Sequence, residues 1–234
     1  MYEITSGTFR SPGGRSLTVF YRQDTNDWNT VSATLTEDEY LLPRGLSGHA
    51  VDVGGYLGTV GIALAADNPD LRVTIIEPVP PNADLIERNI AANDLGDRVT
   101  LIRGAVSGDK EPVTIWYGYR GNEAAEHHAF VGNSTLAYVD GGALDHEEVT
   151  YTPVTLAELV PIDFLKIDCE GGEWSILSGD NAKVGTIVGE SHAVRGHKGS
   201  DIVALLAKTH DVTVIPLAED PEGKGTVEFR AVRR

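Results

Sequence analysis

The stretch Val51-Asp52-Val53-Gly54-Gly55-Tyr56-Leu57-Gly58, followed by Ile75-Ile76-Glu77-Pro78, decides the expected fold. An apolar strand over 49–53 leads into glycines that permit a tight turn and a close approach of the backbone to a ligand. A helix is expected over 59–66, and the next apolar strand, 72–76, ends in Glu77. An acid about 20 residues beyond such a turn can accept hydrogen bonds from both hydroxyls of a ribose. The pattern therefore predicts a site for an adenosine-containing ligand.

The glycine spacing distinguishes between adenosine ligands. Gly54-Gly55-x-x-Gly58 is one residue shorter than the G-x-G-x-x-G fingerprint of dinucleotide-binding folds. Asp52 precedes the glycines and would repel a pyrophosphate, whereas it suits a ligand with a cationic amino group or a polar sugar. S-adenosylmethionine, which carries an ammonium and a sulfonium, fits this charge.

Composition narrows the class of protein. The chain has 234 residues, 41% of them hydrophobic, which is enough for one large domain, and it shows neither a secretory signal nor the roughly 18-residue apolar run of a membrane span. A cytoplasmic protein is expected. The single cysteine, Cys169, excludes an internal disulfide. A net charge of -16 argues against a nucleic-acid partner. The oligomeric state stays open, with a homodimer as one option.

Beyond the glycine turn, apolar runs alternate with helical patterns, which is typical of a doubly wound α/β sheet. We expect one domain over 1–234, in which residues 1–45 cover the cofactor cleft. Within this cover a strand is predicted over 17–21 and a short helix over 37–41. Residues 113–145 break the alternation. Loops this long in compact domains are usually either functional lids or disordered, and the aromatic residues of this one favour a lid over the site. The remaining elements are predicted as helices over 83–93, 155–159, 173–177 and 201–208, and strands over 99–103, 164–167, 186–189, 212–217 and 226–232.

Acidic side chains follow the strand at 164–167, where open α/β sheets bind their ligands. Asp168 and Glu170 are candidate site residues, and Glu173 suits equally the first turn of a helix. One strand later, Glu190 and His192 are two residues apart and face the same way if extended. Asp168, Glu190 and His192 are therefore expected to converge.

At these positions the chain resembles the FkbM-type S-adenosylmethionine-dependent O-methyltransferases. The resemblance spans about residues 50 to 192. It is strongest at Leu165-Lys166-Ile167-Asp168-x-Glu170-Gly171-x-Glu173, and it is also carried by Val51 through Gly58, Glu77-Pro78-x-Pro80 and Gly104-Ala105-Val106-Ser107. Two departures are Gly55-Tyr56, where the family usually has Ala-Asn, and Asn133-Ser134-Thr135, which replaces a more serine-rich stretch.

The resemblance implies a class I methyltransferase fold, a Rossmann-like seven-stranded sheet with an antiparallel last strand. It implies S-adenosylmethionine as cofactor, S-adenosylhomocysteine as product, and a hydroxyl of a sugar, glycoside or polyketide-type natural product as acceptor. The expected cofactor-binding residues are Asp52, Gly54, Gly55, Tyr56 and Gly58 for the methionine end, Glu77 and Pro78 for the ribose, Ala105 and Val106 for the adenine, and Asp168. The expected acceptor-binding residues are Ser134, Glu170 and His192.

Two mechanisms are open for the deprotonation of the hydroxyl. In the first, His192 is the base, oriented by Asp168 or Glu190, because an imidazole titrates near neutral pH. In the second, Asp168 and Glu190 hold Mg²⁺, which binds a diol acceptor as in catechol-type methyltransferases. Two other functions are weighed: an NAD-dependent oxidoreductase, which the short glycine spacing opposes, and a catalytically silent nucleoside-binding module, which has no need of the acids at Asp168, Glu170 and Glu190.

Overall fold

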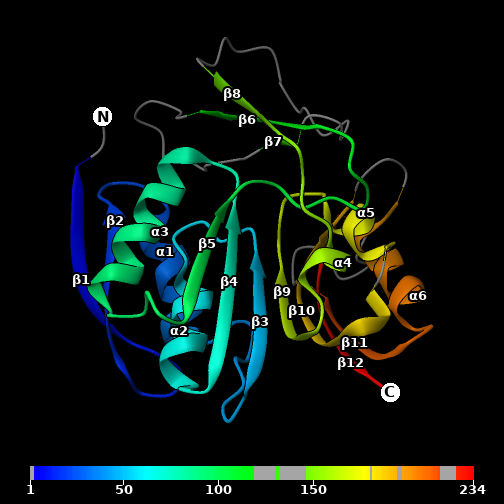
Figure 1. Cartoon of the computed structure of the whole chain (residues 1–234), viewed down its shortest axis with the longest axis horizontal. Helices are drawn as coiled ribbons and strands as arrows, with labels where there is room; N and C mark the ends of the chain where they lie inside the picture. Colours follow the sequence, from blue (N-terminus) through cyan, green and yellow to red (C-terminus); the bar gives the residue numbers. More distant parts are fainter. Residues whose placement is uncertain (1–2, 119–129, 132–145, 180, 194–196, 217–224) are drawn as a thin grey trace. The chain divides into compact units, whose positions relative to one another are not determined.

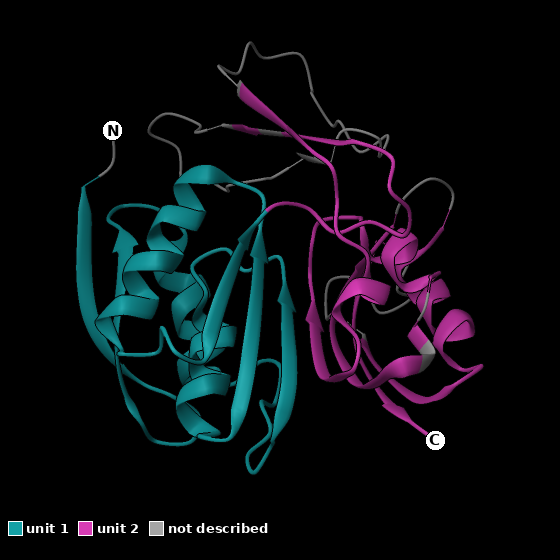
Figure 2. Ribbon diagram, in the orientation of Figure 1, with its two compact units in different colours: residues 1–103, 119–127 teal, residues 104–118, 128–234 magenta. Residues whose placement is uncertain are grey.

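The structure is a computed structural model that describes residues 3–118, 130–131, 146–179, 181–193, 197–216 and 225–234 (Figure 1). The chain divides into two compact units (Figure 2). Unit 1 comprises residues 1–103 and 119–127, and unit 2 comprises residues 104–118 and 128–234. Unit 1 therefore carries the glycine turn and Glu77, and unit 2 carries the acidic segment and His192.

Seven strands form the main sheet. Their order is β11 (His210–Pro216), β12 (Thr226–Arg233), β10 (Val184–His192), β9 (Ile162–Ile167), β3 (Gly48–Val53), β4 (Leu71–Glu77) and β5 (Val99–Arg103). The pairs β3–β4, β4–β5 and β9–β10 are parallel. The last strand of the chain, β12, is antiparallel to both β10 and β11. This confirms the predicted α/β fold with an antiparallel last strand.

The helices of unit 1 differ in how they are buried. α2 (Thr59–Asp67) packs against β3 and β4, and every residue from Thr59 to Ala65 is buried. α3 (Pro80–Ala92) packs against β4 and β5 and is amphipathic, with Ala83, Ile86 and Ile90 on its buried face. Pro80 suits the start of α3, because the first helical N–H has no partner within the helix. These packed helices hold the ends of β3 and β4 in place.

The N-terminal cover is tied to α3 by side-chain amides. It begins with a hairpin of β1 (Ile4–Arg10) and β2 (Ser16–Arg22). Asn89 accepts a hydrogen bond from the Phe20 N–H at 2.6 Å and donates one to the Phe20 carbonyl at 3.2 Å. Asn93 pairs in the same way with Thr18, at 2.9 and 2.8 Å. Asn89 of α3 and Asn93 at the C-cap of this helix therefore bind the backbone groups of β2 at Phe20 and Thr18.

The helical part of the cover precedes its predicted position. The structure has α1 (Asp27–Ser32) followed by a π-helical turn, Ala33–Glu37, so the helix predicted over 37–41 is wrong. Asp38 ends the helix in the left-handed region at φ 53°, and its side chain accepts a hydrogen bond from the Leu42 N–H at 2.8 Å. The next residues form turns. Polar residues fill α1 and hide its helical period.

In unit 2, β9 is followed by α5 (Glu173–Leu177), which packs against β10, and α6 (Ile202–Leu206) packs against β11. α4 (Leu156–Leu159) begins with a capping box formed by Thr155 and Glu158. Short 3-10 helices lie at Asn181–Lys183 and Gly199–Asp201. β10 extends beyond its predicted end at residue 189, so Glu190 and His192 lie within the strand.

The expected lid over 113–145 falls partly outside the described residues. Its described part and the strand that follows form a three-stranded antiparallel sheet of β6 (Val113–Gly118), β7 (Phe130–Val131) and β8 (His146–Tyr151). A lid function therefore stays a prediction. Throughout the described ranges, no helix is both long and apolar enough to cross a membrane.

Candidate active site

The glycine turn of unit 1 links β3 to α2 in a tight conformation. The N–H groups of Gly54 and Gly55 both donate to the Ile76 carbonyl at 3.1 Å, and the Gly58 N–H donates to the Gly55 carbonyl at 2.6 Å. A Cβ atom on Gly55 would lie 2.4 Å from Cγ2 of Ile75, so only glycine fits there. Tyr56 takes a left-handed conformation, φ 51°, which is uncommon for a residue with a side chain.

Glu77 ends β4 as a buried and fully oriented carboxylate. Its exposed fraction is 4%, and it accepts hydrogen bonds from the Tyr56 N–H at 2.8 Å, the Val79 N–H at 2.9 Å and the Asn82 side chain at 3.2 Å. Hydrogen bonds to an ionised acceptor are the strong ones in proteins. The acid predicted to bind the ribose is thus held rigidly against the glycine turn.

Asp52 has a structural task beside its predicted one. The residue is fully buried, and its Oδ2 accepts a hydrogen bond from the N–H of Gly61 at 3.0 Å. Gly61 lies in the first turn of α2, where N–H groups lack partners within the helix. Asp52 therefore caps α2 from the neighbouring strand.

The acidic segment of unit 2 is organised around Glu173. This carboxylate is fully buried at the start of α5 and accepts hydrogen bonds from the N–H groups of Cys169, at 2.8 Å, and Gly171, at 3.1 Å. It also contacts His192, whose Nδ1 lies 3.2 Å from Oε1. The backbone N–H of His192 donates to Oε2 at 3.4 Å. Glu173 thus fixes both the loop after β9 and the imidazole.

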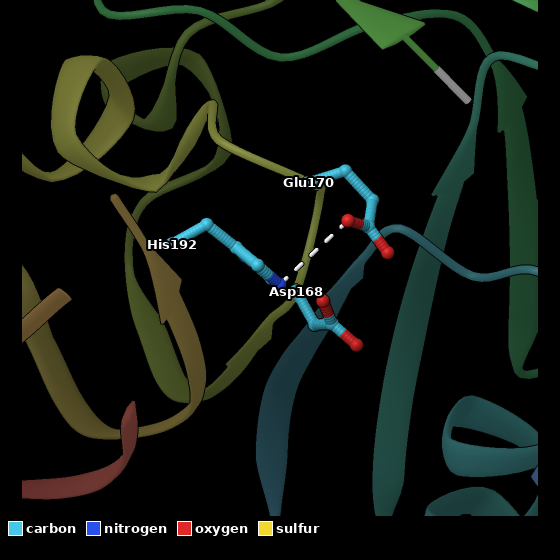
Figure 3. A group of neighbouring side chains, drawn as sticks. All are labelled: Asp168, Glu170 and His192. Atoms are coloured by element: carbon cyan, nitrogen blue, oxygen red, sulfur yellow. Dashed lines mark ion pairs between the residues drawn. The ribbon is translucent and has the colours of Figure 1, made fainter. Parts of the chain in front are cut away.

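The other ring nitrogen of His192 faces two further carboxylates. Nε2 lies 3.6 Å from an oxygen of Glu190 and 3.7 Å from an oxygen of Glu170. Glu170 and His192 point toward one another across the end of β9, beside Asp168 (Figure 3). One ligand atom each from Asp168, Glu170 and His192 lies within 4.8 Å of the others. We call Asp168, Glu170, Glu173, Glu190 and His192 the acid–histidine cluster.

The family of the chain follows from sequence comparison. Residues 52–213, more than half of the chain, match the model of the methyltransferase FkbM domain. The chain belongs to the FkbM methyltransferase family. This confirms the resemblance stated above and, with it, an S-adenosylmethionine-dependent methyltransferase domain. Both the glycine turn from Asp52 on and the whole acid–histidine cluster lie within the matched range.

Individual relatives match short segments of the chain. An O-methyltransferase, imqG, of Aspergillus flavus is 40% identical over 57 residues, 24% of this chain and 23% of that protein. The ribosomal RNA small subunit methyltransferase G of Frankia alni is 38% identical over 64 residues, 27% of this chain and 24% of that protein. These matches thus span about a quarter of each relative. Their names differ in the acceptor, so the matches leave this chain's acceptor open.

A solved structure supports the fold over a longer range. The precorrin-6y C5,15-methyltransferase of Geobacter metallireducens superposes with a TM-score of 0.51 at 14% identity, over 92% of this chain and 93% of that one. At this identity the likeness concerns the fold alone. The likeness agrees with the α/β fold described above.

Within this family member, the acid–histidine cluster perturbs two ionisable groups strongly. Burial lowers the pKa of His192, but the hydrogen bond and charge of Glu173, with the charges of Glu170 and Asp168, outweigh it and raise this pKa to about 10. Burial and the charge of Asp168 raise the pKa of Glu190 to about 7. Although burial opposes it, the His192 hydrogen bond keeps the pKa of Glu173 below its usual range. At neutral pH the imidazole is therefore a cation in this arrangement.

The remaining predicted residues have distinct places. Ala105 is buried, and its carbonyl accepts a hydrogen bond from the Val154 N–H at 3.0 Å, while Val106 and Pro78 are half-buried. Ser134 lies outside the described residues. Sequence reasoning gave Glu173 only an even weight as a helix-capping acid, although its place in the family motif was a usable signal. Sequence reasoning also missed Asp27, a fully buried acid at the start of α1 that accepts a hydrogen bond from the Tyr56 hydroxyl. No motif marks this residue.

Proposed function

We propose that this protein is an O-methyltransferase that transfers the methyl group of S-adenosylmethionine to a hydroxyl oxygen of a small molecule. The cofactor supplies a methyl group already activated by its sulfonium. Asp52, Glu77 and the glycine turn are suited to hold it: a ribose diol needs a carboxylate acceptor, and the cofactor's cationic end favours acidic neighbours. The net charge of -16 favours a small-molecule acceptor over an RNA.

The placement of two carboxylates beside His192 supports oxygen as the acceptor atom, since Nε2 of His192 lies 3.6 Å from an oxygen of Glu190 and 3.7 Å from an oxygen of Glu170. A hydroxyl must lose its proton as the new bond to carbon forms, so a proton acceptor of suitable pKa is needed. The pKa of Glu190, about 7, gives that group a large ionised fraction near neutral pH and makes it basic enough to receive the proton. His192, whose pKa is about 10, already carries a proton.

We assign Glu190 the role of base and the His192–Glu173 pair the role of a fixed cation beside it. The proton passes from the hydroxyl to the carboxylate, and the imidazolium stabilises negative charge as it develops on the oxygen. The earlier expectation of His192 as base stays a prediction, and it requires this pKa to fall by several units when substrates bind. Glu170, which is exposed and close to His192, is suited to contact the acceptor.

Two variants test this assignment. Glu190→Gln should lower kcat about 10²- to 10⁴-fold, the usual worth of a positioned base. The matched control is Glu228→Gln, which removes a carboxylate from the residue paired with Glu190 across β10 and β12. Because the charge of Glu228 helps raise the pKa of Glu190, this control should keep its rate and shift the pH–rate profile to lower pH. Equal losses in both variants would contradict the assignment.

The grouping of Asp168, Glu170 and His192 favours a second candidate, the Mg²⁺-dependent reaction. Chelation distinguishes this reaction from the metal-free reaction with Glu190 as the base. EDTA should abolish activity and added Mg²⁺ restore it if a metal holds the acceptor. Full turnover in EDTA supports the metal-free base. Since Mg²⁺ prefers oxygen ligands and the imidazole here is protonated at neutral pH, we favour the metal-free reaction.

A further inference from the structure

We propose that Asp27 and Arg22 of the N-terminal cover are positioning residues for the cofactor, because they close a hydrogen-bonded ring that orients Tyr56 and Glu77. The inference rests on the proposed function, since it concerns affinity for S-adenosylmethionine and its product. It lies entirely within unit 1. No family motif marks either residue of the pair.

The ring begins with a buried ion pair. Arg22, at the end of β2, and Asp27, at the start of α1, are 3% and 0% exposed. Arg22 binds both oxygens of Asp27, through Nε at 2.9 Å and Nη2 at 3.2 Å, and its backbone N–H donates to Oδ2 at 2.8 Å. A buried ion pair is weak evidence for stability by itself, since desolvation offsets much of its attraction. The contacts of the pair with Tyr56 and Asn82 point to a second role.

One arm of the ring runs from Asp27 to the glycine turn. The Tyr56 hydroxyl donates to Oδ1 of Asp27 at 2.5 Å, and Tyr56 donates through its backbone N–H to Oε2 of Glu77 at 2.8 Å. Burial and the charge of Asp27 raise the pKa of Tyr56, so the hydroxyl remains a donor throughout the physiological range. The left-handed backbone of Tyr56 is held in place by its surroundings, and the hydroxyl bond to Asp27 contributes to this.

The other arm runs from Arg22 through α3. Nη1 of Arg22 donates to Oδ1 of Asn82 at 2.8 Å, and Nδ2 of Asn82 donates to Oε1 of Glu77 at 3.2 Å. The two arms therefore reach different oxygens of the same carboxylate. Five residues from the cover, the turn, β4 and α3 form a closed ring. Together with the Val79 N–H, this ring fixes the rotation of the Glu77 carboxylate.

The consequence concerns affinity. A carboxylate that is already oriented loses little conformational entropy when it binds a ribose diol. Breaking the ring at the cover should leave Glu77 in place but allow its carboxylate and the turn to move, so the cofactor binds less tightly. Once the cofactor is bound, the chemistry is unaffected. The expected signature is a higher KM for S-adenosylmethionine with kcat unchanged.

Tyr56→Phe is the sharpest test, because it removes only the hydroxyl bond to Asp27. Calorimetric titration with S-adenosylhomocysteine should show affinity about 3- to 30-fold lower, since the lost bond is charge-assisted. Asp27→Ala, which removes both acceptor oxygens, should also weaken binding, and in that background Tyr56→Phe should add little. Glu77→Ala is the positive control and should lose at least about tenfold. Asn93→Ala is the matched control, because Asn93 ties the cover to α3 without touching the turn.

The outcomes separate two failures. If the wild type binds S-adenosylhomocysteine, and Tyr56→Phe binds it equally well with an unfolding midpoint like that of Asn93→Ala, the positioning role is overturned. A loss in Asn93→Ala as large as in Tyr56→Phe would also overturn it, because stability alone would then explain both. Absence of binding by the folded wild type would overturn the proposed function and this role with it.

Discussion

At the residue scale, Glu173 shows how burial converts an acid into a fixed charge. It is fully buried, yet it stays ionised because two backbone N–H groups and His192 all interact with its oxygens. The pair in turn places a cation between Glu170 and Glu190. The positive charge of His192 therefore depends on Glu173 more than on the exposed Glu170.

Glu173→Gln should lower the pKa of His192 from about 10 toward or below its ordinary value, because Glu173 is its strongest stabilising partner. In the wild type the imidazole NMR signals of His192 should not titrate through neutral pH, whereas in the variant they should. Stability should fall by about 3 to 5 kcal/mol, the usual cost of breaking a buried ion pair.

Glu170→Gln is the control for this substitution, since Glu170 interacts with the same imidazole but is exposed. Its effect on stability should stay within about 1 kcal/mol, as for other exposed ion pairs. A wild-type His192 that titrates near pH 6.5 would contradict the described electrostatics of the cluster.

At the element scale, the close approach of β9 and β10 depends on glycines of β10, above all on Gly189. Gly189 has φ 154°, and a Cβ atom there would lie 1.7 Å from the Ile167 carbonyl oxygen. Gly189→Ala should destabilise the fold by about 3 kcal/mol or more, because backbone cannot move aside as a flexible side chain can. Gly96→Ala should be nearly neutral, since a Cβ atom there would meet nothing within 4 Å. Comparable unfolding midpoints in urea for the two variants would contradict this account.

Element by element, the sequence predicted segments with a clear apolar pattern or helix signal better than segments without one. β5 and α5 have the predicted bounds, because an apolar run marks the first and an acid in the first turn marks the second. The sequence did not predict β1, since every second residue of it is exposed and, among the described strands, it pairs with β2 alone. The end of β10 was placed too early, because Glu190, Ser191 and His192 are polar although they continue the strand beside β12.

The sequence likewise predicted some residues of the site and missed others. Motifs marked the residues of strand ends, such as Glu77, Asp168 and His192, because ligand sites in α/β sheets gather there. The ring formed by Arg22 and Asp27 has no such signal, since its contacts join segments far apart in the sequence. Their burial and pairing, which only the structure supplies, single them out among the many charged residues of the chain.

At the scale of the whole molecule, the cluster should leave a mark on stability against pH. The pKa of His192 is about 10 in the folded protein and roughly 6.5 in an unfolded chain. Between about pH 6.5 and pH 10, His192 is therefore protonated in the folded protein but neutral in the unfolded chain. The stabilisation that His192 gives the fold is complete below about pH 6.5 and is lost as the pH rises through about 10.

Urea unfolding of the wild type and of His192→Gln measures the contribution of His192 together with the neighbouring carboxylates whose pKa values it shifts, because titrations remote from the cluster cancel in the difference. The difference in unfolding free energy should shrink by an amount on the order of a few kcal/mol between about pH 6 and pH 10. A difference that stays constant over this range would show that His192 is not a buried cation.

We propose that this FkbM-family protein methylates a hydroxyl with Glu190 as the base. The decisive measurement is the pH dependence of kcat for methyl transfer from isotopically labelled S-adenosylmethionine to a panel of hydroxyl compounds, with EDTA present. We expect a labelled methyl ether and a kcat that rises through about pH 7, with this activity lost in Glu190→Gln. A product labelled on nitrogen or carbon, or a Glu190→Gln variant with the wild-type profile, would contradict it.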